Sequence, residues 1–249
     1  MSALITVRGL RVVYPGGTEA LHSVDVDIED GSFVAAIGLS GAGKSTFLRS
    51  LNRLVTPTAG SITIAGREVA SARGAEVRRV RRETGMIFQQ FNLIRRLPVL
   101  RNVLVGRLGF HSGFGSVWPR FTAQDIAVAE QALERVGLAD RAWTRADRLS
   151  GGQQQRVAIA RALAQEPRLI LADEPVASLD PETSSVILGH LRDINRRDGI
   201  TTIAALHQLD LAERFADRAI AFRAGKIVYD GPAAGLAARA YDLVYRGEG

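Results

Sequence analysis

One stretch, residues 38–45 (GLSGAGKS), constrains this chain more than any other, because it fits the pattern G-x-x-x-x-G-K-[ST]. The apolar run FVAAI precedes it, and a segment of helical character begins at Lys44. Glycines at 38, 41 and 43 let the backbone turn so that successive N–H groups point inward, where they can bind phosphate. The stretch therefore predicts a nucleotide-binding core in which a strand, a phosphate loop and a helix follow one another.

The polar side chains of this loop have distinct tasks in binding a nucleotide. Lys44 would bring its charge to the β- and γ-phosphates, and Ser45 would ligate Mg²⁺. The chain has only two lysines, Lys44 and Lys226, beside thirty arginines. A lysine at position 44 therefore indicates a site that needs a compact point charge, which a planar guanidinium would not replace well. The other reading is a glycine-rich turn that caps a helix. The loop residues that we predict to bind ATP are Gly38, Ser40, Gly41, Gly43, Lys44, Ser45 and Thr46.

Two adjacent carboxylates end an apolar strand at residues 168–175 (RLILADEP). Asp173 fits the place where a phosphate-loop fold supplies an acidic ligand to Mg²⁺. Glu174, one residue further, is placed to take a proton from a water molecule that attacks the phosphate. The other reading, a strand end with solvated acids, would leave Lys44 without a Mg²⁺ partner.

Residues 149–156 (LSGGQQQR) look like half of an anion site. Ser150, the N–H groups of Gly151 and Gly152 and the end of the following helix could all face a phosphate. The stretch has neither a lysine nor a metal ligand, so a phosphate held by these groups alone would be weakly bound in water.

The order of strand-like and helical runs predicts the fold class. Up to about Gly66 strands dominate, in the runs ITVRGLRVVY, SVDVDI, FVAAIG and SITIAG, with one helix from Lys44 towards Leu54. TGMIF at 84–88 is a further strand, and residues 90–165 read mostly as helix, broken by GFHSGFGSVWPRF. After that, RLILA and TTIAAL alternate with the helical runs PETSSVILGHLRDINRR and LDLAERFA, and RAIAFRAGKIVYDG reads as a hairpin.

This pattern predicts an α/β phosphate-loop NTPase core, with a mostly parallel sheet covered by helices, an antiparallel β portion and an inserted α-helical subdomain. We expect one domain over 1–249. Residues 1–89 and 166–249 would form the nucleotide-binding core, and residues from about 90 to 165 the helical subdomain.

Composition excludes several classes of function. The chain has no cysteine, which excludes disulfides, thiolate catalysis and cysteine-bound metals. No apolar run approaches the length of a membrane span and the N-terminus lacks a signal pattern, so we expect a cytoplasmic chain that does not itself cross a membrane. The net charge of +6 comes from scattered arginines. The one dense cluster is predicted to be a solvated helix face and no nucleic-acid site, because no aromatic residues interleave it: Arg78, Arg79, Arg81 and Arg82.

With GLSGAGKS, LSGGQQQR and RLILADEP in this order, the chain resembles the ATP-binding-cassette (ABC) ATPases over essentially its whole length. The resemblance implies further site residues: Tyr14 to stack on adenine, Gln89 to sense Mg²⁺ and the attacking water, Gln153 within the signature, and Asp180 in the loop (Ser178 to Asp180) that crosses between subunits. It also implies that His207 contacts the γ-phosphate.

The family also implies an assembly. Two copies would form an ATP-dependent head-to-tail dimer in which LSGGQ closes over ATP held by the other copy's GLSGAGKS. The dimer would work on two transmembrane permease subunits at the cytoplasmic face of the cell membrane, with a solute-binding protein as an indirect partner. The region from Gln89 to Arg107 is the expected surface towards the permease.

A narrower resemblance points to a substrate. QQQR after the signature glycines and PVASLD after the acidic pair resemble the ATPase subunits of phosphonate importers. The resemblance implies coupling of ATP hydrolysis to uptake of phosphonate or a related phosphorus oxyanion. Four alternatives stay open: transport of another solute such as an amino acid, export of lipid or peptide, a soluble non-transport ABC ATPase, and a nucleotide-binding regulator without turnover.

Overall fold

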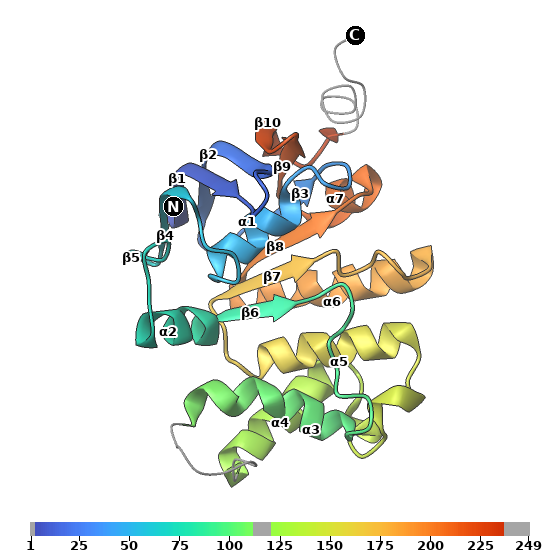
Figure 1. Cartoon of the computed structure of the whole chain (residues 1–249). Helices are drawn as coiled ribbons and strands as arrows, with labels where there is room; N and C mark the ends of the chain where they lie inside the picture. Colours follow the sequence, from blue (N-terminus) through green and yellow to red (C-terminus); the bar gives the residue numbers. More distant parts are fainter. Residues whose placement is uncertain (1–2, 112–120, 237–249) are drawn as a thin grey trace.

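The computed structural model describes residues 3–111 and 121–236. Of the predicted break GFHSGFGSVWPRF, residues 112–120 lie outside the described part of the chain. Figure 1 shows an antiparallel sheet at the upper left, a larger sheet that runs from the top to the middle of the molecule, and a group of helices at the bottom.

The larger sheet has the strand order β10-β9-β3-β8-β7-β6 within the described residues. All neighbouring pairs from β9 to β6 are parallel, and β10 joins β9 as an antiparallel hairpin across Ala224 and Gly225. Its strands are β3 (Phe33–Ile37), β6 (Thr84–Ile87), β7 (Leu169–Asp173), β8 (Thr201–Leu206), β9 (Arg218–Arg223) and β10 (Lys226–Pro232). The carboxyl ends of the parallel strands meet at one edge, so the residues that follow β3, β6, β7 and β8 gather there.

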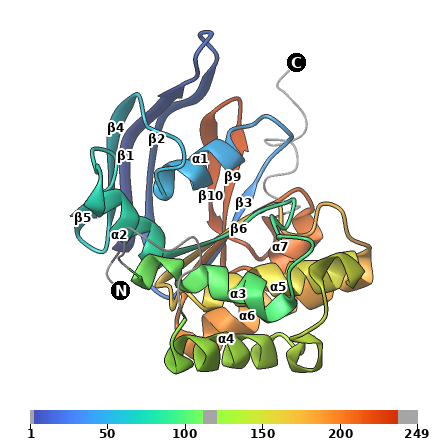
Figure 2. The same ribbon diagram turned by 60° about the horizontal axis from the view of Figure 1, so that its bottom comes forward.

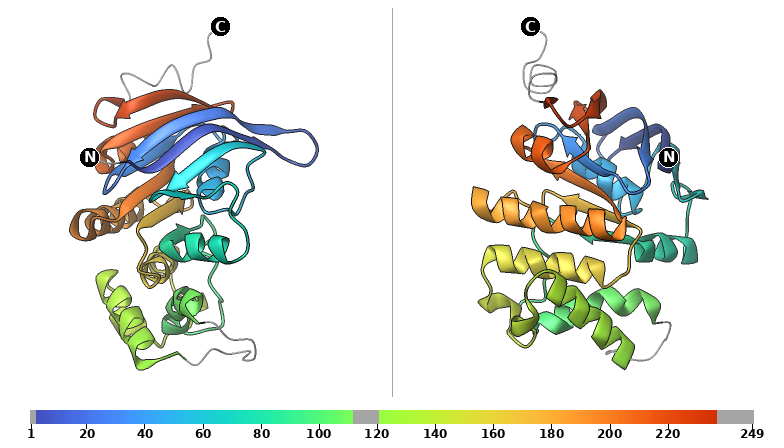
Figure 3. Two further views of the ribbon diagram at one scale, coloured as in Figure 1. Left: turned by 90° about the vertical axis from the view of Figure 1, so that its left-hand side faces the viewer. Right: turned by 180° about the vertical axis from the view of Figure 1, so that it is seen from behind.

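The smaller sheet is antiparallel where its strands pair, in the order β2-β1-β4-β5. Its strands are β1 (Ala3–Val13), β2 (Glu19–Glu29), β4 (Ala59–Ile64) and β5 (Arg67–Glu68). Along β2 buried and exposed residues alternate, because one face of this sheet packs on the core and the other meets solvent. Figure 3 shows this sheet arching over α1 (Lys44–Leu51).

Helices cover the main sheet on the side opposite α1. Below it lie α5 (Gly151–Leu163) and α6 (Pro181–Asp198), and α3 (Val99–Leu104) and α4 (Ala123–Arg135) form a further layer that comes forward in Figure 2. The remaining helices are α2 (Ala75–Glu83), α7 (Leu209–Phe215) and the 3₁₀ turns η1 (Val105–Phe110), η2 (Ala139–Arg141) and η3 (Ala146–Arg148). In the described residues no helix is long and apolar enough to span a membrane.

The two faces of strand β3 contribute side chains to two different hydrophobic cores. All five of its residues are buried. Phe33, Ala35 and Ile37 face the helical core, while Val34 and Ala36 face the core shared by α1 and the antiparallel sheet. An unbroken apolar run is what a parallel strand needs when both of its faces are covered.

The predicted fold class is confirmed, and the differences are local. The helix that begins at Lys44 ends at Leu51, shortly before Arg53, whose φ is 58°. Between 90 and 98 the chain is not helical, because Phe91 and Asn92 both have φ of 49° and Pro98 precedes the first turn of α3. The arginine-rich segment is helix α2, which has no buried residue, so the prediction of a solvated face is confirmed.

Candidate active site

The phosphate loop leaves the buried strand β3 and enters α1, and glycine is required at two of its positions for steric reasons. A Cβ atom at Gly38 would lie 2.4 Å from the carbonyl oxygen of Phe222, and one at Gly43 would lie 2.8 Å from that of Ala20. Both glycines also have positive φ, of 153° and 110°. The neighbouring strands thus press on the loop, and its backbone path is open to glycine alone.

Lys44 is 3% exposed and its ammonium group lies inside the loop. Nζ donates hydrogen bonds to the carbonyl oxygens of Gly38 at 2.7 Å and Leu39 at 3.0 Å. Burial lowers the pKa of Lys44, while the carboxylates of Glu174 and Asp173 oppose that shift. The lysine predicted to meet the β- and γ-phosphates therefore lies close to both predicted acids.

Asp173 joins the end of β7 to the first turn of α1. Its Oδ1 accepts a hydrogen bond from Ser45 Oγ at 2.6 Å, and its Oδ2 accepts two from Arg49, at 2.8 and 3.1 Å. The carboxylate is 2% exposed, so these donors replace water around a buried charge.

The pair Ser45 and Asp173 fits the chemistry of Mg²⁺. A hydroxyl and a carboxylate are hard oxygen ligands, and Mg²⁺ in nucleotide sites uses one or two carboxylates together with phosphate oxygens and water. The described residues contain no group of three or more His, Cys, Asp or Glu side chains arranged for a metal. Ser45 and Asp173 would supply two of the ligands of such a metal and leave its other positions to phosphate oxygens and water.

Glu174 and His207 form a pair at the carboxyl edge of the sheet. His207 Nε2 lies 2.8 Å from Glu174 Oε1, although the two residues follow different strands, β7 and β8. Glu174 has φ of 52°, an uncommon conformation for a residue with a Cβ atom. Both residues line a cavity of about 310 Å³. A carboxylate held beside Lys44 and a histidine is suited to accept a proton from water.

Tyr14 is hydrogen-bonded to the first turn of α1. Its hydroxyl lies 3.1 Å from Thr46 Oγ1, at hydrogen-bond distance, and the residue is 37% exposed. A half-open aromatic ring next to the phosphate loop can offer a face to a base, so the predicted adenine contact stays a prediction with a suitable position.

Ser150 is the N-cap of α5. Its hydroxyl accepts from the backbone N–H of Gln153, whose side chain in turn accepts from the backbone N–H of Ser150. This capping box satisfies two helix-end donors and leaves the other first-turn N–H groups at the helix end.

Glycine at position 152 is required by the packing of α5 against α6 within one chain. A Cβ atom there would lie 2.5 Å from Thr183 Cγ2, at the start of α6. Thr183 in turn donates from its backbone N–H and from Oγ1 to the carboxylate of Asp180, the N-cap of α6. The hydrogen bonds from Thr183 lower the pKa of Asp180. Gly152 and Asp180, both predicted nucleotide contacts, therefore also join α5 to α6.

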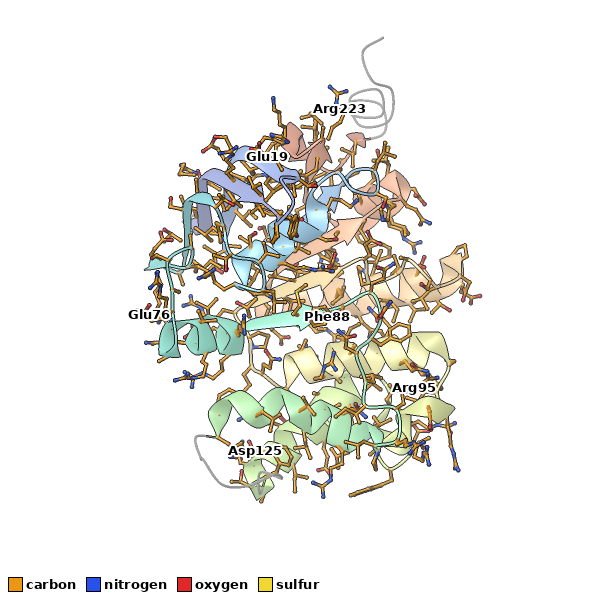
Figure 4. The ribbon with its side chains drawn as sticks, in the orientation of Figure 1. Glu19, Glu76, Phe88, Arg95, Asp125 and Arg223 are labelled. Atoms are coloured by element: carbon orange, nitrogen blue, oxygen red, sulfur yellow. The ribbon has the colours of Figure 1, made fainter. Side chains whose placement is uncertain are left out.

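Gln89 lies in an exposed turn directly after β6. With its neighbours Gln90, Phe91 and Asn92 it lines a cavity of about 550 Å³ that also includes Ser178 and Gln154. The loop runs from Phe88 at the end of β6 down to Arg95 beside the helical layer (Figure 4). Its turn starts at the same sheet edge as Glu174 and His207.

The predicted residues fall into two groups. Lys44, Ser45, Asp173, Glu174 and His207 converge at the carboxyl edge of the sheet. Ser150 to Gln153 begin a helix on the other face, and in the described residues no hydrogen bond or ion pair joins them to residues 38–46. Figure 1 shows the separation as α1 above β7 and α5 below it.

Arg49 is a site residue that we did not predict from the sequence. Its position four residues after Ser45 places both on one face of α1, and that spacing was an available signal. Its contact with Asp173 needs the fold, because 124 positions separate the two residues.

Comparison with known proteins is consistent with this geometry. The family described as "ABC transporter" matches residues 21–177. The phosphonates import ATP-binding protein PhnC of Thiobacillus denitrificans is 54% identical over 249 residues, which cover 100% of this chain and 95% of that protein. PhnC 1 of Oceanobacillus iheyensis is 50% identical, covering 97% of this chain and 94% of its own.

Among solved structures, a dimeric post-hydrolysis state of the ATP-binding cassette MJ0796 bound to ADP and Pi superposes with a TM-score of 0.80. It is 35% identical in sequence and covers 92% of this chain and 98% of its own.

Proposed function

This chain belongs to the ABC transporter family, and we propose that it is the ATP-hydrolysing subunit of an importer for phosphonates or related phosphorus oxyanions. The observation that carries the proposal is the convergence of Lys44, Asp173 and Glu174 at one loop, with His207 2.8 Å from the glutamate. The substrate class rests on the relatives named as phosphonate import proteins, which are similar to this chain over nearly its whole length.

The reaction is hydrolysis of ATP to ADP and phosphate. The water oxygen forms a bond to the γ-phosphorus as the bond from that phosphorus to the bridging oxygen breaks, and Glu174 receives a proton from the water. Lys44 and the loop N–H groups bind the phosphates. Mg²⁺, held by Ser45, Asp173 and Gln89, would neutralise phosphate charge. His207 holds the glutamate by the contact seen here and would face the γ-phosphate.

The active assembly in this proposal is a dimer that acts on membrane partners. Ser150, Gly151, Gly152 and Gln153 of one copy would complete the ATP site of the other, with Asp180 at the crossing. ATP then holds the two copies together and hydrolysis releases them. The residues from about 90 to 165 would serve as a helical subdomain that passes this movement to two permease subunits at the cytoplasmic face of the membrane. A solute-binding protein would deliver the solute to these permease subunits.

The test of the chemistry is Glu174→Gln. Because the amide cannot accept the proton, turnover should fall by about a thousandfold, while ATP binding persists and the ATP-bound dimer accumulates. Glu130→Gln, which alters an exposed carboxylate on α4, is the matched control and should hydrolyse ATP like the parent. Phosphate release and binding of a fluorescent ATP analogue measure the two effects. A Glu174→Gln protein that turns over at the parent rate would refute the assignment.

The test of the substrate uses this chain assembled with its permease and solute-binding protein in vesicles. A binding protein loaded with methylphosphonate should stimulate ATP hydrolysis, and one loaded with an amino acid should not. Stimulation by the amino acid alone would instead support the alternative importer class.

A further inference from the structure

Arg161, near the C-terminal end of α5, binds the loop that carries Gln89. Its Nη1 donates to the carbonyl oxygen of Asn92 at 2.6 Å and its Nη2 donates to that of Phe91 at 2.8 Å. The two acceptors are 69 and 70 positions away in the chain and belong to consecutive residues of one turn. A planar guanidinium presents its donors in a fixed fork that can reach two such oxygens, whereas the three donors of an ammonium sit on one nitrogen at the end of a flexible stem.

This side chain has no acidic partner within ion-pair distance among the described residues. Arg161 is partly buried, and this burial lowers the pKa of its guanidinium. The buried Arg107, by contrast, has ion pairs with Asp125 and Glu166. Among the described residues, the guanidinium of Arg161 therefore has two loop carbonyl oxygens as its hydrogen-bond acceptors and no carboxylate beside them.

The loop has a conformation that needs external support. Phe91 and Asn92 are consecutive residues with φ of 49°, a left-handed region that a residue such as Phe91 rarely adopts, although Asn adopts it more readily. Strained backbone of this kind persists when surrounding contacts hold it. The two carbonyl groups bound by Arg161 belong to these same two residues.

The helix under Arg161 is closely packed. A Cβ atom on Gly106 of η1 would lie 2.3 Å from the carbonyl oxygen of Arg161, and one on Gly85 of β6 would lie 3.1 Å from the Cβ atom of Ala162. Two other elements thus contact α5 at this turn without room for a side chain. The base from which Arg161 reaches the loop is rigid.

The same loop also approaches the other end of α5. A Cβ atom on Gly151 would lie 4.0 Å from Cζ of Phe91. Gly151 precedes Arg161 by ten residues, which is roughly 15 Å along a helix. The loop therefore places the Phe91 ring near the first turn of α5 and is hydrogen-bonded near the last turn through two carbonyl groups.

We propose that Arg161 is a positioning residue that fastens residues 89–92 to α5, so that Gln89 and the Ser150 end of the helix move as one unit. The inference rests on the proposed function for the roles of Gln89 and Ser150, although the fastening itself concerns the chain alone. In this arrangement a shift of the loop displaces the signature end by the same movement. When the signature of one copy closes over ATP bound by the other copy, the loop that faces the permease would therefore move with it.

The experiment replaces Arg161 by Met in the full chain and measures backbone hydrogen exchange. Amides of residues 90–94 should exchange about tenfold faster or more, because the loop loses the donors that hold it closed. Amides of β6 should be unchanged. Arg161→Lys, which keeps the charge but lacks the fixed fork of donors, should give an intermediate rate.

Arg156→Met is the matched control. Arg156 lies on the same helix and donates from Nη1 to two carbonyl oxygens, those of Val136 and Gly137, which belong to the end of α4 and not to the loop. Its replacement should leave residues 90–94 at the parent exchange rate. Unchanged exchange in Arg161→Met, or an equal rise in Arg156→Met, would overturn the proposal.

Kinetics provide the second measurement. Arg161→Met should lower kcat for ATP by about tenfold with KM within about twofold of the parent, because Lys44 and its loop are untouched. A rise in KM without a loss of kcat would contradict positioning. If the parent chain fails to hydrolyse ATP, the proposed function fails, while the exchange result still decides whether Arg161 fastens the loop.

Discussion

At the scale of single residues, the phosphate loop needs glycine for two different reasons. At Gly38 the obstacle is both steric and conformational, since a Cβ atom would lie 2.4 Å from the Phe222 carbonyl oxygen and φ is 153°. At Gly41 no atom lies within 4 Å of such a Cβ, and φ of 79° is the only constraint. Glycine is needed at position 38 because β9 lies against the loop there, and at position 41 because the backbone turn has a positive φ.

Gly38→Ala and Gly41→Ala should therefore differ in stability. The first should lower the free energy of unfolding by about 3–5 kcal/mol, because backbone atoms must move apart. The second should cost about 1–2 kcal/mol, the price of a left-handed residue with a Cβ atom. Urea denaturation of the nucleotide-free chain measures both. Equal losses would show that β9 does not press on the loop.

At the scale of elements, the segment between β6 and α3 has no regular structure and is held by side chains. Asn102 on α3 is 1% exposed. Its Oδ1 accepts from the N–H of Ile94 at 2.7 Å, and its Nδ2 lies within 3.4 Å of the carbonyl oxygens of Ile94, Leu97 and Pro98. Asn102 thus holds the second half of the segment on α3, as Arg161 holds the first half on α5.

Asn102→Ala should lower the free energy of unfolding by about 2–4 kcal/mol, because several backbone groups lose their only side-chain partner in a buried place. Arg101→Ala, one residue earlier on the exposed side of α3, should change it by less than about 0.5 kcal/mol. Thermal or urea unfolding measures the pair. A neutral Asn102→Ala variant would mean that water replaces the amide.

At the scale of the whole molecule, the phosphate loop and the signature stretch LSGGQ, which we predict to be two halves of one site, lie on opposite faces of the main sheet. The phosphate loop leads into α1, which packs with the antiparallel sheet, while α5 belongs to the helical core. With the sheet between them, one copy cannot readily close its own signature over its own phosphate loop. A second copy is the simplest source of the missing half, in the manner of an isologous dimer.

Ser150→Arg should bind ATP but fail to dimerise, because a long charged side chain would occupy the place of the neighbouring copy's phosphate. Light scattering with ATP and Mg²⁺ in the Glu174→Gln background measures this. Ser150→Ala is the control: it loses the helix cap at a cost of about 1 kcal/mol but adds no bulk, and it should still form dimers. A Ser150→Arg variant that still forms dimers in this background would rule out a composite site.

Some residues could be placed from the sequence because their partners are close along the chain. The phosphate loop, the acidic pair after a buried strand and the signature with its capping partner Gln153 each span fewer than ten positions. Their chemistry depends on local backbone geometry, namely turns, strand ends and a helix N-terminus, and local geometry follows from short patterns. The strand runs predicted the mixed sheet for the same reason.

Other contacts of the site could be identified only from the tertiary structure. Arg49 meets Asp173 across 124 positions, and Arg161 meets Asn92 across 69. Gly152 owes part of its requirement to Thr183 on another helix. No pattern within the chain specifies which distant carbonyl or carboxylate an arginine will reach, because that choice depends on how sheets and helices pack. The sequence by itself determined the chemistry of the nucleotide site, and the packing decided which side chains hold its parts together.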